Sequence, residues 1–109
     1  MSRSNIFALI EVSKLSDSLT TDVSSAKKHL KSQVSYFEII NSKYFSDALK
    51  SEWETIRNYM THKGPVIDET GRLKSNALVN TVDNLSEMEC VLVAVKVKEL
   101  NDKLKEEFK

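Results

Sequence analysis

FSDALKSEWETIRNYM, residues 45–60, decides the fold class of this chain. Its apolar side chains recur every three or four positions, which is the spacing of one face of an α-helix. They are Phe45, Leu49, Trp53, Ile56 and Met60. Gly64 and Pro65 follow closely and both end helices, because glycine adopts the left-handed conformation of a helix C-terminus and proline does not fit a helix interior. We therefore predict a helix that ends at His62, with Trp53 in the core.

A second apolar stripe runs through the N-terminal part of the chain. Its members also recur at steps of three and four: Leu15, Leu19, Val23, Ala26, Leu30, Val34, Phe37 and Ile40. Serine, threonine and aspartate side chains at residues 16–22 compete for backbone hydrogen bonds and favour helix ends over helix interiors. The pattern predicts either one helix over residues 5–41 or two helices broken near residues 18–21.

The C-terminal part predicts a short helical piece to Asn84 and then a long helix. Ser86, followed three residues later by Glu89, is the pattern of a capping box, which begins a helix. We expect the core face of this helix to hold Val91, Leu92, Val95, Leu100, Leu104 and Phe108. Residues 91–97 also alternate well enough for a β-strand, but the flanking Glu, Lys and Leu favour the helix. Residues 66–73 are the section with short-strand or irregular character.

Composition limits the chain to one small domain, residues 1–109. Apolar residues make up 40% and charged residues 29%, a balance that sustains a folded core. Two glycines and one proline leave few sharp turns, whereas multi-stranded β domains need turn residues about every 8 to 12 positions. We therefore predict an all-α fold, a bundle of three or four helices with a long N-terminal helix or helix pair and a long C-terminal helix.

Charge and cysteine content narrow the class of function. The 16 basic and 16 acidic side chains cancel, so the strongly cationic surface of a general nucleic-acid binder is not indicated. Cys90 is the single cysteine, which excludes an internal disulfide, fits a reducing compartment and predicts a buried side chain. The apolar runs at residues 6–10 and 90–95 are too short for a signal-peptide core or a membrane span. We expect a cytoplasmic protein without a membrane partner.

One segment sets reactive side chains at a patterned spacing. Arg57 and Asn58 are followed by His62 at the end of the predicted helix. Cleavage of RNA without a metal needs a group that exchanges protons near neutral pH, which imidazole does. It also needs a permanent cation that binds two phosphate oxygens in a fork, which guanidinium does. The segment therefore suits phosphate chemistry, and we expect neither a metal nor a cofactor.

The pattern Arg57-Asn58-x-x-x-His62, followed by Gly64, resembles the R-x4–6-H motif of HEPN domains. That family consists of small helical bundles that commonly dimerise. The wider likeness covers residues 41–109. The resemblance implies a metal-independent endoribonuclease of toxin or defence type, or a descendant that binds RNA or a partner without cutting.

The resemblance also implies a role for each motif residue. His62 takes part in proton transfer at the ribose 2′-hydroxyl, Arg57 steadies the scissile phosphate, and Asn58 orients the site by hydrogen bonding. Tyr59 and Lys63 are the neighbouring candidates for contact with RNA. In branches that act as toxins beside a nucleotidyltransferase partner, a tyrosine stands two positions after the histidine; this chain has Gly64 there, so that branch is not indicated.

The spacing of the motif favours a homodimer. Residues five apart on an ideal helix lie about 140° from one another, so Arg57 and His62 do not share one face of the helix. A symmetric dimer brings both copies of each residue around one cleft. Long amphipathic helices on so short a chain should also leave an apolar seam exposed, which self-association would cover.

The same residues have a second interpretation. Arg57 can be a structural arginine and His62 a helix-ending histidine, since a chance match to the bare spacing is expected in roughly one in six chains of this composition. A non-catalytic helical module then fits the chain nearly as well. Its partner would be another protein, as for an antitoxin-like or phage-encoded adaptor.

Overall fold

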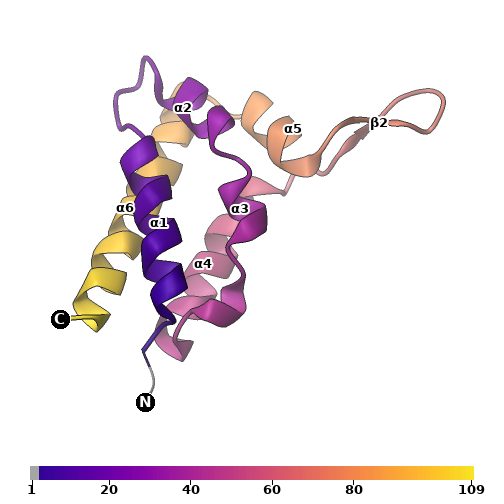
Figure 1. The fold of residues 1–109 in the computed structure, drawn as a ribbon. Helices are drawn as coiled ribbons and strands as arrows, with labels where there is room; N and C mark the ends of the chain where they lie inside the picture. The colour runs from indigo at the N-terminus through magenta and orange to yellow at the C-terminus, as the bar shows by residue number, and fades with distance from the viewer. Residues whose placement is uncertain (1–2) are drawn as a thin grey trace.

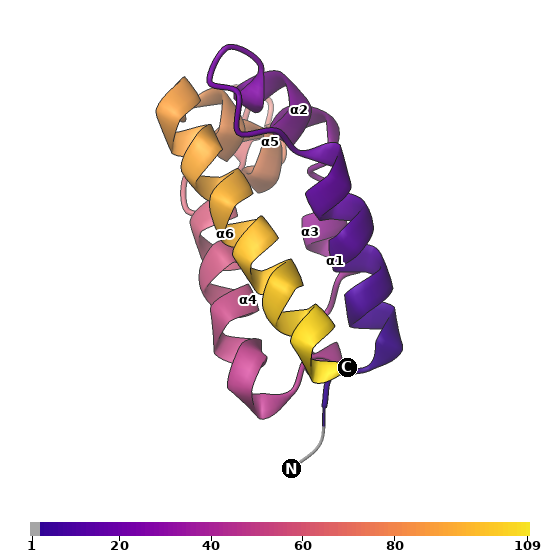
Figure 2. The ribbon, with the colours of Figure 1, turned by 90° about the vertical axis from the view of Figure 1, so that its left-hand side faces the viewer.

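Three long helices run side by side in the computed structural model, which describes residues 3–109 (Figure 1). They are α1 (Ile6–Ser18), α4 (Asp47–Met60) and α6 (Glu87–Glu107), and α6 lies between the other two (Figure 2). The shorter elements are α2 (Ala26–Ser32), α3 (Tyr36–Ile39), the 3-10 helix η1 (Ser42–Tyr44), α5 (Ala77–Asp83), and the strands β1 (Val66–Ile67) and β2 (Leu73–Ser75). The predicted all-α class with a long C-terminal helix is confirmed.

Helix α4 forms as its apolar spacing predicts, and its stripe is buried. Trp53 is fully buried and stacks between two rings, with centroid distances of 5.5 Å to Phe37 and 5.6 Å to Phe45. Its indole Nε1 donates a hydrogen bond to the carbonyl oxygen of Ile40 at 3.1 Å. Trp53 therefore joins α4 to the chain segment around α3, and the prediction that it belongs to the core is confirmed.

The prediction of one N-terminal helix over residues 5–41 is wrong, and the alternative of two helices is closer to the structure. The chain leaves the helix after Ser18, where a break was predicted, because the Thr20 and Asp22 side chains accept hydrogen bonds from backbone N–H groups two residues on. Lys98 also donates to the Ser16 carbonyl at 2.7 Å, which satisfies the end of α1. A second, unpredicted break at residues 33–35 separates α2 from α3.

Helix α6 begins with the predicted capping box. Ser86 Oγ accepts from the Glu89 backbone at 3.1 Å, and Glu89 Oε1 accepts from the Ser86 backbone at 2.8 Å. Residues 91–97 are helical, so the strand alternative is excluded.

The predicted core face of α6 is partly wrong. Leu100 and Leu104 are buried as expected, but Leu92 is 55% exposed. Val91, Val95 and Phe108 are only partly buried. The upper core face consists of Cys90, Val93, Ala94 and Val97. This part of the helix carries apolar residues on two sides, and packing against α1, α2 and α4 selects one of them.

A partly buried carboxylate ties the two ends of the described chain to the start of α4. Glu107 accepts from the backbone N–H of Ser4 at 2.8 Å and from the hydroxyl of Ser46. Ser46 N–H in turn donates to Ser4 Oγ at 2.9 Å. Burial raises the pKa of Glu107, but these hydrogen bonds outweigh it, so the pKa lies below its usual value.

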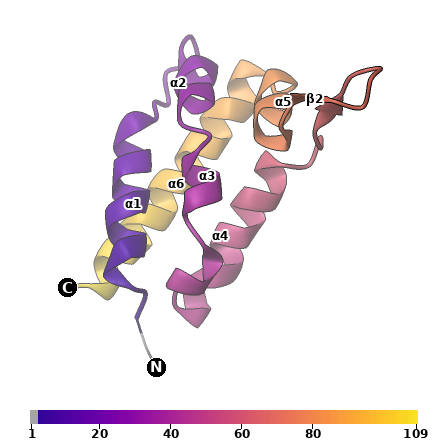
Figure 3. The ribbon, with the colours of Figure 1, turned by 45° about the vertical axis from the view of Figure 1, so that its right-hand side comes forward.

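After α4 the chain turns into a small arm. Gly64 has a φ of 67°, the left-handed conformation expected after a helix end, and α4 itself ends at Met60, two residues before the predicted end. Strands β1 and β2 pair antiparallel, with Ile67 opposite Leu73, and project from the bundle (Figures 1 and 3). Among residues 3–109, no helix combines the length and the apolar character needed to cross a bilayer.

Candidate functional site

Arg57 is anchored on the side of α4 that faces α3. Its Nε donates a hydrogen bond of 2.8 Å to the carbonyl oxygen of Phe37, in the α3 segment. This bond engages one edge of the guanidinium and leaves its two terminal nitrogens for other partners. The side chain is therefore held in one orientation although the residue is exposed.

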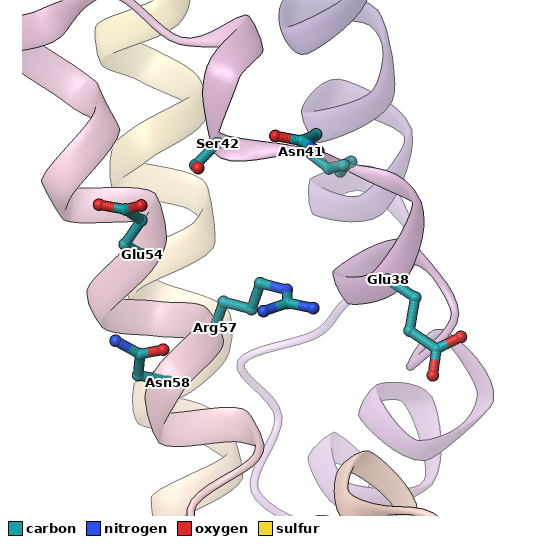
Figure 4. Close-up of a pocket in the computed structure, with 7 residues that line it drawn as sticks. Glu38, Asn41, Ser42, Glu54, Arg57 and Asn58 are labelled. Carbon is teal, nitrogen blue, oxygen red and sulfur yellow. The ribbon is translucent and has the colours of Figure 1, made fainter.

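The guanidinium of Arg57 lies in a surface pocket of about 390 Å³ between α4 and residues 38–42. The lining residues are Glu38, Ile40, Asn41, Ser42, Glu54, Arg57 and Asn58. In Figure 4, Arg57 reaches across this space from α4 toward α3, whereas the carboxylates of Glu54 and Glu38 point away from it. The pocket is therefore bordered by two carboxylate residues, and Arg57 is the charged side chain that reaches across it.

His62 lies beyond the end of α4 and is exposed. Its ring stacks on Tyr59 with a centroid distance of 5.0 Å, and its Nδ1 lies 2.6 Å from the Tyr59 carbonyl oxygen. A carbonyl oxygen only accepts, so Nδ1 carries the hydrogen of this bond. The ring is thereby oriented, and Nε2 is left as the nitrogen that can accept a proton from an outside group.

Tyr59 connects this turn to the start of α6. Its hydroxyl donates to Glu89 Oε2 at 3.2 Å. Burial, and then the bond to Glu89, raise the pKa of the Tyr59 hydroxyl, while hydrogen bonds from Ser86 hold the pKa of Glu89 below its usual value. Tyr59 therefore stays protonated and Glu89 anionic at neutral pH.

Tyr59 also forms one wall of an apolar groove of about 250 Å³ between α4 and α6. Leu92 lines the same groove from α6, with Val93 and Lys96 beside it. We call this the α4/α6 groove. Sequence spacing did not indicate it, because the spacing assigned Leu92 to the core.

Lys63 is exposed, and its backbone is attached to α5. Its N–H donates to Thr81 Oγ1 at 3.2 Å, and its carbonyl oxygen accepts from Asn80 Nδ2 at 3.4 Å. The amide of Asn80 also donates to the Gly64 carbonyl at 2.9 Å. These bonds hold the turn that carries His62, and no motif spacing in the sequence signalled them.

The structure brings some of the predicted site residues together and separates others. Arg57 and Asn58 line one pocket, while His62 and Tyr59 lie toward α6. Because successive helix residues turn by about 100°, Asn58 lies on the outer face of α4, between the α3 side and the α6 side. Within one chain, Arg57 and His62 therefore do not converge on one point.

Neither metal-binding geometry nor similarity to other proteins assigns a function to the described residues. Across residues 3–109, no three His, Cys, Asp or Glu side chains gather closely enough to hold a metal ion. Comparison with protein families, curated proteins and solved structures found no match. The functional interpretation therefore depends on the geometry of the site itself.

Proposed function

We propose that the chain is an RNA-directed protein resembling HEPN domains, a metal-independent endoribonuclease of toxin or defence type that uses Arg57 and His62. The orientation of Arg57 carries this proposal. With Nε bound to the Phe37 carbonyl, the terminal nitrogens form a fixed fork in an open pocket. A fork of this kind binds two oxygens of a phosphate. A cytoplasmic location belongs to the same proposal, since Cys90 stays reduced there.

In the proposed reaction His62 Nε2 takes the proton of a ribose 2′-hydroxyl. The 2′-oxygen attacks the neighbouring phosphorus, the bond from phosphorus to the 5′-oxygen breaks, and the leaving oxygen takes up a proton from a protonated imidazole. Arg57 binds the phosphate oxygens and Asn58 orients the group, while Tyr59 and Lys63 contact the flanking RNA. Since Arg57 and His62 face different sides of one chain, the reaction requires a homodimer.

The test is cleavage of labelled single-stranded and structured RNA in the presence of EDTA. We expect His62→Ala and Arg57→Ala each to lower the cleavage rate at least about 100-fold. The matched controls are His29→Ala and Arg72→Ala, which remove the same side chains from other exposed positions and should leave the rate unchanged. Cleavage that survives His62→Ala or Arg57→Ala would remove the proposed site.

A second function is favoured by the α4/α6 groove. A non-catalytic helical module that binds a protein partner, as an adaptor or antitoxin does, would use exposed apolar side chains such as Tyr59 and Leu92. The same assay separates the two functions. An intact parent protein that cuts no RNA favours the binding module.

A further inference from the structure

Glu89 is shared between the start of α6 and the candidate site. Its Oε1 accepts the backbone N–H of Ser86 at 2.8 Å and closes the capping box of α6, while its Oε2 accepts the Tyr59 hydroxyl at 3.2 Å. The Tyr59 ring in turn stacks on His62, with centroids 5.0 Å apart and an interplanar angle of 23°. A chain of contacts therefore links the first turn of α6 to the imidazole beyond the end of α4.

The carboxylate of Glu89 is held in place by the capping box. Ser86 Oγ also accepts the Glu89 backbone N–H at 3.1 Å, so the backbone and the side chain of Glu89 are both fixed. The hydrogen bonds with Ser86 lower the pKa of Glu89 most, and the Tyr59 hydroxyl and the charge of His62 lower it further. The carboxylate is thus anionic at neutral pH and near enough to His62 for their charges to interact.

The orientation of the His62 ring depends on support from its neighbours. His62 is exposed, and the hydrogen bond of 2.6 Å from its Nδ1 to the Tyr59 carbonyl forms only in one orientation of the imidazole. The Tyr59 ring covers one face of the imidazole and limits its rotation. Because Tyr59 is itself 37% exposed, its bond to Glu89 is the polar contact that fixes the free end of its ring.

We propose that Glu89 is a positioning residue for the proposed reaction and that it acts on His62 through the Tyr59 ring. In this orientation the imidazole keeps its hydrogen on Nδ1 and presents Nε2 to a ribose 2′-hydroxyl. In serine hydrolases a carboxylate orients the histidine directly, whereas here a tyrosine lies between the two. The role of Glu89 in catalysis rests on the proposed function, but the orientation of His62 exists without RNA.

The first test is the tautomer of His62 in the full chain, measured by long-range ¹H–¹⁵N NMR of the imidazole rings at about pH 8.5, where an ordinary histidine is neutral. We expect His62 to carry its hydrogen mainly on Nδ1. Glu89→Ala and Tyr59→Leu should each lower the ratio of the Nδ1–H form to the Nε2–H form about threefold or more, because each removes a support of the ring. His29, exposed on α2, is the internal control and should not change.

Ser86→Ala is the matched control for the capping box. It weakens the start of α6, but the backbone N–H at this position still binds Glu89 Oε1, and the bond from Tyr59 remains. Its tautomer ratio should therefore equal that of the parent. Glu89→Gln is the conservative variant, because glutamine also fits a capping box and its amide can bind the Tyr59 hydroxyl. Its tautomer ratio should stay close to that of the parent.

The second test is cleavage of labelled RNA in EDTA by the same variants. Glu89→Ala should lower kcat about tenfold or more and leave KM nearly unchanged, since Glu89 acts through Tyr59 and His62. Glu89→Gln should recover most of this loss, and Ser86→Ala should cut at close to the parent rate.

Three results would overturn the inference. They are a parent whose His62 carries its hydrogen mainly on Nε2, a change of the tautomer ratio in Ser86→Ala as large as that in Glu89→Ala, and cleavage by Glu89→Ala at the parent rate. A parent that has the Nδ1–H form, loses it in Glu89→Ala and cuts no RNA supports the orientation of His62 by Glu89 and contradicts the proposed function alone.

Discussion

The two ends of α4 differ in how firmly they are held. Trp53, in the middle of the helix, is stacked on two rings and hydrogen-bonded to Ile40, and Ser46 at the start of the helix binds Glu107. At the other end, the Arg57 side chain makes one hydrogen bond and His62 is exposed. The firmly packed part fixes the direction of the helix. At the other end Met60 is still buried, but the Arg57 and His62 side chains are exposed. The proposed chemistry is thus placed at the end of α4 opposite the Ser46–Glu107 hydrogen bond.

Trp53→Ala should have the largest effect. It removes the buried ring between Phe37 and Phe45, and large aromatic deletions in cores cost about 3 to 5 kcal/mol. The free energy of unfolding in urea, followed by circular dichroism, measures this loss. Trp53→Phe keeps a ring but leaves the Ile40 carbonyl without its donor, so its cost should be smaller. A cost below about 1 kcal/mol for the alanine variant would show that this part of α4 is not the anchor.

Glu107→Gln tests the hydrogen-bonded cluster at the start of α4. The folded chain lowers the pKa of Glu107, so the carboxylate contributes stability above its unfolded pKa and loses it as the pH falls through the folded value. We expect a cost of about 1 kcal/mol at neutral pH, since the group is only partly buried. The stability of the variant should also fall less steeply between neutral and acidic pH. Glu106→Gln, an exposed neighbour, is the control.

Features set by local sequence patterns could be predicted, whereas features set by the packing of neighbouring helices could not. The α4 stripe and the Ser86 capping box are local patterns, and both are confirmed. The side of α6 that carries Leu92 was assigned wrongly, because apolar residues occur on two sides and only the neighbouring helices decide between them. The break at residues 33–35 also depends on tertiary packing, since no proline or glycine marks it.

Candidate site residues could be named from their spacing, but their directions could not. Arg57 is oriented by the Phe37 carbonyl, twenty residues away in the chain, and a backbone acceptor leaves no signature in the sequence. His62 is oriented by Tyr59, three residues before it, and held in place through Thr81 and Asn80 of α5. The contacts of Arg57 with Phe37 and of the His62 turn with α5 join segments far apart in the sequence, so they appear only when the helices are packed together.

Ser86→Ala, at the start of α6, should lower the stability of the fold by an intermediate amount. It removes the hydroxyl that accepts from the Glu89 backbone at the start of α6, and losing such a cap costs about 1 kcal/mol. Thermal unfolding measures the change. Ser51→Ala, an exposed serine within α4, is the matched control and should be neutral or slightly stabilising, because alanine favours helices. Equal losses in both variants would mean that the capping box adds nothing.

His62→Ala should change stability least, by no more than about 0.5 kcal/mol. The imidazole is exposed, and the turn keeps its backbone hydrogen bonds without it, from His62 N–H to the Tyr59 carbonyl and from Gly64 N–H to the Thr61 carbonyl. Urea unfolding of the variant beside the parent checks this. A larger loss would make His62 a structural residue, and reduced RNA cleavage in the variant would then follow from a weakened fold. If His62→Ala leaves the free energy of unfolding unchanged but abolishes RNA cleavage, the loss of cleavage is due to the missing imidazole itself.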